Sequence, residues 1–75
     1  MVFERIKTLI AEHIEVDESD ISESSDFYAD IGCDELDFIE IQLAVEDEFD
    51  ISIPDADAEK ITTVGELADY IKANI

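Results

Sequence analysis

Hydrophobic residues recur at helical spacing in three stretches of the chain. The first stretch runs from Val2 to Val16, and the second begins at Glu35 and runs to about Phe49. The third begins at Thr63 and continues to the C-terminus. Apolar residues three or four positions apart form lengthwise stripes on an α-helix. The pattern therefore predicts three amphipathic helices.

The expected helix starts carry capping residues. Asp34 precedes further carboxylates within three residues, which suits an N-cap followed by a first turn at the positive end of the helix dipole. Thr63 and Glu66 have the spacing of a capping box. Pro54 stands near the start of a short helical piece, where its missing N–H costs little. Only residues 51–53 alternate like a strand, so the sequence predicts an all-α bundle with three full helices and one short helix.

A long polar loop separates the first two of these helices. Residues 17–33 are rich in Asp, Ser and Glu and show no sustained hydrophobic period. An irregular loop of this length in a small domain either serves a function or is held down by anchors. We expect Ile21, Phe27, Tyr28 and Ile31 to anchor it to the core.

The second helix carries apolar residues on two separate arcs. At about 100° per residue, the first arc is wide enough to face a core and comprises Phe38, Ile41, Val45 and Phe49. The second arc comprises Leu36, Ile39 and Leu43. Its borders are Gln42 and Glu46 on one side, and Asp37, Glu40, Asp47 and Glu48 on the other. The second arc either packs against the long loop or the short helix, or forms a docking surface whose carboxylates orient a basic partner.

Charge is the feature of the composition that restricts function most. The 75-residue chain contains 22 Asp and Glu against 4 Lys and Arg, a formal net charge of -18. Such a field attracts basic protein surfaces and repels phosphate backbones, which argues against nucleic-acid binding. The length predicts one domain over residues 1–75. With a charged N-terminal stretch and no apolar run of about 20 residues, we expect a cytoplasmic monomer without membrane insertion.

The sequence offers little for catalysis or metal binding. No His, Cys or Ser is placed as a base-and-nucleophile set, and the single histidine, His13, has no evident partner. The loop at residues 17–33 lacks the alternating ligands, central Gly and closing Glu of an EF-hand. We therefore expect neither an enzyme nor a metal site.

Several short motifs follow one another in an order and spacing typical of one protein family. They are DIGCDELD at 30–37, VEDEFD at 45–50, IPD at 53–55 and EKITTV at 59–64, together with Glu40. With these motifs the chain resembles the acyl carrier proteins of fatty-acid and polyketide synthesis, over nearly its whole length and without an insertion. The resemblance implies a four-helix bundle with a long first loop and a short third helix, in agreement with the hydrophobic pattern.

The resemblance also implies a function for the second helix. In the family, a serine at the start of this helix receives 4'-phosphopantetheine, whose thiol carries acyl groups as thioesters. Family members dock acyl-chain-handling enzymes through the same helix, so basic patches of such enzymes are the expected partners. The residues that the resemblance assigns to docking are Asp34, Leu36, Glu40, Leu43, Glu46 and Asp47, with Ile53 and Asp55 as further candidates.

The chain departs from the family at the attachment position, where Glu35 stands in place of the serine. A hydroxyl forms a phosphodiester by attacking the pyrophosphate of coenzyme A, whereas a carboxylate would give a mixed anhydride that water cleaves. We therefore predict that the chain carries no cofactor in this form. The loop serines Ser19, Ser22, Ser24 and Ser25 lie well before the helix start, and Cys33 precedes the cap, so we expect none of them to replace the missing serine.

Two interpretations of this departure stay open. The chain is a carrier that cannot be modified, either through natural loss or through deliberate replacement of one residue. Alternatively, it is an acidic interaction or regulatory protein that binds partner enzymes without acyl cargo. Both interpretations keep the docking surface and lose the attachment chemistry.

Overall fold

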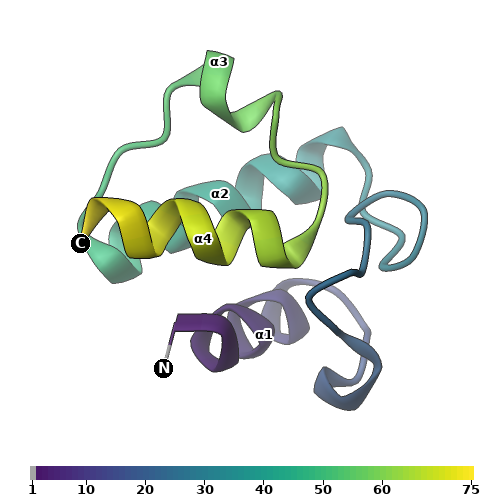
Figure 1. The fold of residues 1–75 in the computed structure, drawn as a ribbon. Helices are drawn as coiled ribbons and strands as arrows, with labels where there is room; N and C mark the ends of the chain where they lie inside the picture. The colour runs from purple at the N-terminus through teal and green to yellow at the C-terminus, as the bar shows by residue number, and fades with distance from the viewer. Residues whose placement is uncertain (1) are drawn as a thin grey trace.

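The computed structural model describes residues 2–75, which form four α-helices and one 3-10 turn (Figure 1). The elements are α1 (Val2–His13), η1 (Glu18–Asp20), α2 (Glu35–Phe49), α3 (Asp55–Ala58) and α4 (Val64–Asn74). Within this part of the chain, the one strand-like feature is an isolated β-bridge between Asp26 and Thr63. The expected all-α bundle with a long first loop and a short third helix is confirmed.

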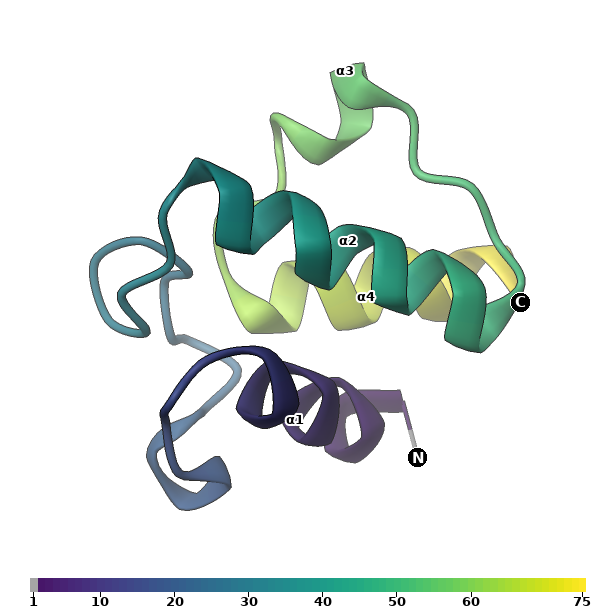
Figure 2. The same ribbon diagram turned by 180° about the vertical axis from the view of Figure 1, so that it is seen from behind.

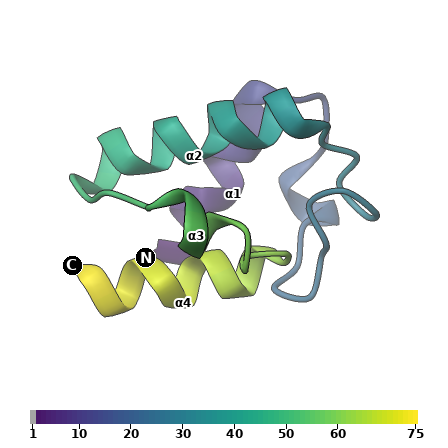
Figure 3. The same ribbon diagram turned by 90° about the horizontal axis from the view of Figure 1, so that it is seen from above.

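The three long helices enclose the core, and α3 lies apart from α1. α2 and α4 run in roughly the same direction, and α1 runs opposite to them and contacts both (Figures 1 and 2). α3 sits between α2 and α4 on the side away from α1, as the view from above shows (Figure 3). No helix among residues 2–75 is long and apolar enough to cross a bilayer.

The core draws on every helix and on the long loop. The buried helical residues are Ile6, Leu9 and Ile10 of α1, Phe38, Ile41 and Val45 of α2, Ala58 of α3, and Val64, Leu67, Ala68 and Ile71 of α4. Ile21, Phe27, Cys33, Ile53 and Ile61 add buried side chains from the connecting segments. The first arc of α2 therefore faces the core as expected, with Phe49 partly buried at its end.

α1 ends at His13, three residues before the expected end at Val16. The N–H of Ile14 still donates to the carbonyl of Ile10 at 3.0 Å, but the N–H of Val16 donates to the carbonyl of Ile14 at 2.9 Å. This tight turn replaces a further helical turn. In a longer helix, the acidic residues at positions 15 and 17 would lie at the negative end of the helix dipole. Ile14 and Val16 are β-branched and have a lower helix propensity, so both effects favour an early end of α1.

α2 is capped at both ends. The Asp34 side chain accepts from the Asp37 N–H at 2.7 Å, and the Asp37 side chain accepts from the Asp34 N–H at 3.2 Å. This reciprocal capping box satisfies two backbone donors and confirms Asp34 as the N-cap. At the other end, Asp50 adopts φ 54°, a left-handed conformation that Asp tolerates and that ends helices.

The long loop is anchored as expected at three of four positions. Ile21 and Phe27 are buried, and Ile31 packs partly buried against the core. Tyr28, the fourth expected anchor, is not buried in the core and remains 47% exposed. Its ring covers Phe38 from outside at a centroid distance of 5.9 Å, which leaves the phenol group in water.

The same loop is hydrogen-bonded to the start of α4. The carbonyl of Ser25 accepts from the N–H of Val64 at 3.0 Å, and the carbonyl of Glu23 accepts from the N–H of Gly65 at 2.8 Å. The N–H groups in the first turn of a helix have no partner inside the helix. The loop supplies these partners, so α4 and the loop stabilise each other.

Candidate functional site

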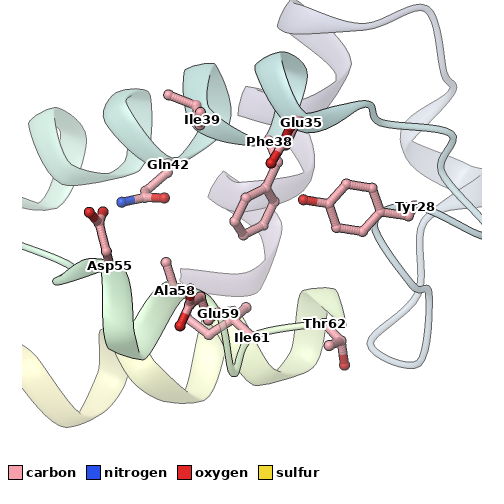
Figure 4. A pocket seen from close by; sticks show the side chains of 10 residues that line it. All are labelled: Tyr28, Glu35, Phe38, Ile39, Gln42, Asp55, Ala58, Glu59, Ile61 and Thr62. Carbon is pink, nitrogen blue, oxygen red and sulfur yellow. The ribbon is translucent and has the colours of Figure 1, made fainter.

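Glu35 is the residue that the sequence resemblance assigns to the cofactor-attachment position. It is the first residue of α2, directly after the Asp34 cap, and it is exposed. Figure 4 shows its side chain beside Phe38 and near Tyr28. Partial burial and, next, the Glu35 carboxylate raise the pKa of Tyr28, so the phenol keeps its proton at neutral pH and can donate a hydrogen bond.

The second arc of α2 faces outward. Leu36 is 63% exposed, Ile39 48% and Leu43 59%, although all three are apolar. The alternative that this arc packs against the loop or α3 holds only in part for Ile39, whose side chain lines a pocket between α2 and α3. Leu36, Ile39 and Leu43 are therefore called the exposed arc below.

Carboxylates border the exposed arc, and few cations lie near them in the sequence. Glu40 and Asp47 are exposed on α2. Glu48 is paired with Arg5, whose Nε lies 3.0 Å from Oε2; their hydrogen bond raises the pKa of Arg5 and lowers that of Glu48. Residues 8–59 contain no Lys or Arg. The face around α2 is thus suited electrostatically to a basic surface.

Two of the residues assigned to docking have structural roles instead of a free surface position. Ile53 is 4% exposed, so its side chain belongs to the core and not to a docking surface. Its N–H donates to Oε2 of Glu46 at 2.6 Å, and its carbonyl accepts from Nε2 of Gln42 at 3.2 Å. Glu46 and Gln42 thereby fix the segment that leads into α3.

A pocket of about 480 Å³ lies between the first half of α2 and the α3 region (Figure 4). Its lining comprises Tyr28, Glu35, Phe38, Ile39 and Gln42 on one side, and Asp55, Ala58, Glu59, Ile61 and Thr62 on the other. Asp55, a docking candidate, is therefore at the pocket rim. α3 is also held to α4 by the hydrogen bond that the Tyr70 hydroxyl donates to Asp57 at 2.9 Å.

The sequence did not indicate this pocket. Its residues come from the long loop, from α2 and from the α3 region, which are separate along the chain. The sequence pattern of each segment alone predicts only a loop or a helix. Tyr28, Gln42 and Glu59 in particular were not recognised as site residues. The exposed ring of Tyr28, close to the start of α2, marks the pocket, but its exposure follows from the path of the loop and not from the sequence pattern.

Cys33 is a poor substitute nucleophile. It is 6% exposed, and burial, with smaller effects from Asp37 and Asp34, raises the pKa of its thiol to about 11. Because the thiolate is the reactive form, the thiol is almost inert at neutral pH. Cys33, the residue before the N-cap, is therefore neither accessible nor deprotonated enough to attack coenzyme A.

This protonation predicts a measurable alkylation rate. At pH 8, we expect iodoacetamide to modify Cys33 about 200-fold more slowly in the folded chain than in the same chain in denaturant, because the raised pKa lowers the thiolate fraction by that factor. The folded rate should rise about tenfold per pH unit toward pH 11. A folded rate that levels off below pH 9.5 would contradict the raised pKa.

Two comparisons with known proteins agree with this geometry. A family model described as "Phosphopantetheine attachment site" matches residues 4–71. A curated acyl carrier protein of Clostridium acetobutylicum is 46% identical over 74 residues, which cover 99% of this chain and 96% of that protein. The chain belongs to the acyl carrier protein family. Its fold and its membership identify a carrier protein and not a catalytic enzyme, as expected from the sequence.

In the present chain, the residues that the resemblance assigns to docking fall into three groups. The first group is exposed on α2 and at its N-cap, and comprises Asp34, Leu36, Glu40, Leu43 and Asp47. Asp55 is exposed at the start of α3. Glu46 is partly buried and accepts a hydrogen bond from the N–H of Ile53, whose side chain is buried. The exposed residues of α2 and Asp55 are the members of the assigned set that a partner could contact directly.

Proposed function

We propose that this chain is a carrier-type docking module that stays permanently without phosphopantetheine, a cytoplasmic monomer that binds acyl-chain-handling enzymes through α2. The observation that carries the proposal is the combination at the start of α2. A complete capping box at Asp34 and Asp37 and an exposed Leu36 surround a carboxylate where the family has a hydroxyl. The recognition features are present, and the attachment group is absent.

The residue at the attachment position does not fit 4'-phosphopantetheine. A stable phosphodiester needs a hydroxyl oxygen, and Glu35 offers only carboxylate oxygens. An exposed mixed anhydride would be open to water, so no lasting product would form. The nearest other nucleophile, Cys33, is buried and protonated.

Glu35 is easily accommodated by the fold. In the first turn of α2, a negative side chain faces the positive end of the helix dipole, a contribution of about 0.3–1 kcal/mol. Glutamate is also a better helix former than serine. The replacement can therefore remove the attachment chemistry without weakening the helix that docks partners.

Intact mass tests the covalent part of the proposal. This chain and a Glu35→Ser variant are incubated with coenzyme A and a broad-specificity phosphopantetheinyl transferase. We expect no mass gain for this chain and a gain of one phosphopantetheine for Glu35→Ser, because only the variant presents a hydroxyl. A mass gain on this chain would refute the proposal, and an unmodified Glu35→Ser would show that transferase recognition has been lost.

The docking part rests on the exposed arc and its border. Apolar side chains at 36, 39 and 43 form one stripe along α2, and Glu40 and Asp47 lie beside it in water. Exposed apolar patches with polar rims mark interaction sites. Rim charges chiefly accelerate association and make it dependent on salt.

Kinetics at varied ionic strength test this surface. Neutralising Glu40 and Asp47 together, as Glu40→Gln and Asp47→Asn, should slow association with the transferase roughly two- to tenfold at low salt and flatten its salt dependence. The control carries Glu12→Gln and Asp69→Asn, the same change in charge on exposed positions of α1 and α4. Equal slowing in both double variants would assign the effect to net charge and contradict a docking surface on α2.

The second candidate function is an acidic regulatory protein whose partner is not a carrier-handling enzyme. The stretch of residues 8–59 without a Lys or Arg favours it, since this stretch suits basic partners in general. The Glu35→Ser variant separates the two functions. Modification of that variant supports the carrier-type surface, and failure of modification in a folded variant supports the regulatory function.

A further inference from the structure

The backbone of Ile53 is held by two side chains of α2. The N–H of Ile53 donates to Oε2 of Glu46 at 2.6 Å, and Nε2 of Gln42 donates to the carbonyl of Ile53 at 3.2 Å. Gln42 and Glu46 are four residues apart, so they lie on the same side of the helix. Together they satisfy both polar groups of one residue, as a neighbouring strand would. These two hydrogen bonds are called the Ile53 clamp below.

The Ile53 clamp determines how the chain enters α3. Residues 51–54 belong to no helix or strand, and Pro54 has no N–H to donate. Ile53 as a whole residue is 4% exposed, so its backbone groups are shielded from water. A buried N–H or carbonyl without a partner is costly. The partners on α2 therefore fix this segment, and they do so with side chains and not with backbone.

α3 is too short to hold its own position. It comprises four residues, Asp55–Ala58, of which only Ala58 is buried. A helix of one turn is not stable by itself, so its place is set by the segments on either side. On one side, the Tyr70 hydroxyl donates to Asp57 at 2.9 Å, which ties α3 to α4. On the other side, the Ile53 clamp ties the entry to α3 to α2.

Asp55 is the docking candidate whose position depends most directly on the Ile53 clamp. It is exposed, it lies two residues after Ile53, and it lines the pocket across from Gln42 (Figure 4). Glu40 keeps its position through α2 itself. Asp55 keeps its place across the pocket from Ile39 only while the segment before α3 is fixed. Two carboxylates of the docking surface are thus positioned by different means.

From this arrangement we propose that Gln42 and Glu46 are positioning residues for docking. They contact the backbone of Ile53 and not the partner, and they hold the Asp55 carboxylate where the basic patch of an acyl-chain-handling enzyme meets it together with Glu40. The inference rests on the proposed function, because it needs a partner that docks on α2. Glu46 thus contributes to docking through its hydrogen bond and not through its charge.

Two replacements of Glu46 separate the hydrogen bond from the charge. Glu46→Gln and Glu46→Met both remove the charge, but only Gln keeps an acceptor oxygen. Amide exchange at Ile53 should be roughly tenfold faster in Glu46→Met than in Glu46→Gln. At low salt, Glu46→Gln should associate with the phosphopantetheinyl transferase within about twofold of the unaltered rate, and Glu46→Met about two- to fivefold more slowly. Equal association rates for the two variants would overturn the positioning role.

A double-mutant cycle separates positioning from a general loosening of the fold. Asp55→Asn should slow association about two- to fivefold in the unaltered chain, and it should have almost no further effect once Gln42→Met and Glu46→Met have broken the Ile53 clamp. Glu40→Gln is the matched control, because it should slow association by the same factor with and without the Ile53 clamp. An undiminished effect of Asp55→Asn, or an equal loss of the effect of Glu40→Gln, would overturn the inference.

The inference and the proposed function fail in different ways. If Glu40→Gln has no effect on association in the unaltered chain, docking through α2 is refuted. If Glu40→Gln slows association, but the effect of Asp55→Asn is absent or does not depend on the Ile53 clamp, only the positioning role is refuted.

Discussion

Replacing Phe27 by alanine is expected to unfold most of the protein at low ionic strength. Phe27 is fully buried, and its ring meets that of Phe38 edge-on, with centroids 5.1 Å apart and an interplanar angle of 71°. Truncation of a buried Phe to Ala costs about 3–5 kcal/mol. A chain of this size has a total stability of roughly 4–11 kcal/mol. Repulsion within a net charge of -18 lowers that reserve further when little salt is present.

The matched control for Phe27→Ala is Tyr28→Ala, one residue further along the loop. Tyr28 is 47% exposed, so its truncation removes less buried surface and leaves no closed cavity. Urea denaturation at two salt concentrations should give a loss of about 3–5 kcal/mol for the first variant and less than about 1.5 kcal/mol for the second. Equal losses would contradict the assignment of Phe27 as the loop's main anchor.

Replacing Gly65 by alanine is expected to destabilise the protein, although alanine is the better helix former by about 1 kcal/mol. A Cβ atom at Gly65 would lie 2.8 Å from the carbonyl oxygen of Glu23 and 3.1 Å from its Cβ. That same carbonyl accepts the Gly65 N–H, so the loop cannot move away without losing the hydrogen bond. Overpacking of this kind costs about 1–3 kcal/mol.

Asp69→Ala is the control for Gly65→Ala, because Asp69 is exposed in the middle of the same helix. By helix propensity alone, this control should be neutral or slightly stabilising. Thermal unfolding of both variants at equal salt checks the prediction. A higher melting temperature for Gly65→Ala than for the unaltered chain would contradict the close approach of the loop to α4.

The sequence predicted the features of the fold that depend on neighbouring residues. The capping boxes at Asp34 and Thr63 are local patterns, since the cap and its partner are three residues apart. The two arcs of α2 are also local, because the helix period alone separates the buried Phe38 from the exposed Leu36. This local information was sufficient for the helix positions, apart from the end of α1, and for the exposed arc of α2.

The features that the sequence did not predict depend on contacts between distant segments. The hydrogen bond between Gly65 and Glu23 joins a helix start to a loop, and neither residue type indicates the other. Ile53 lies in a segment too short to show a period, so its burial beneath Glu46 could not be inferred. The pocket next to Glu35 likewise needs α3 in place, and tertiary hydrogen bonds such as Tyr70 to Asp57 hold that helix.

The most direct test of the central claim is the intact mass of the chain purified from the cells that produce it. We expect the mass of the unmodified polypeptide, with no fraction that carries phosphopantetheine or an acyl thioester. A species heavier by one phosphopantetheine, localised by fragmentation to Glu35 or to any other residue, would refute a permanently unmodified chain.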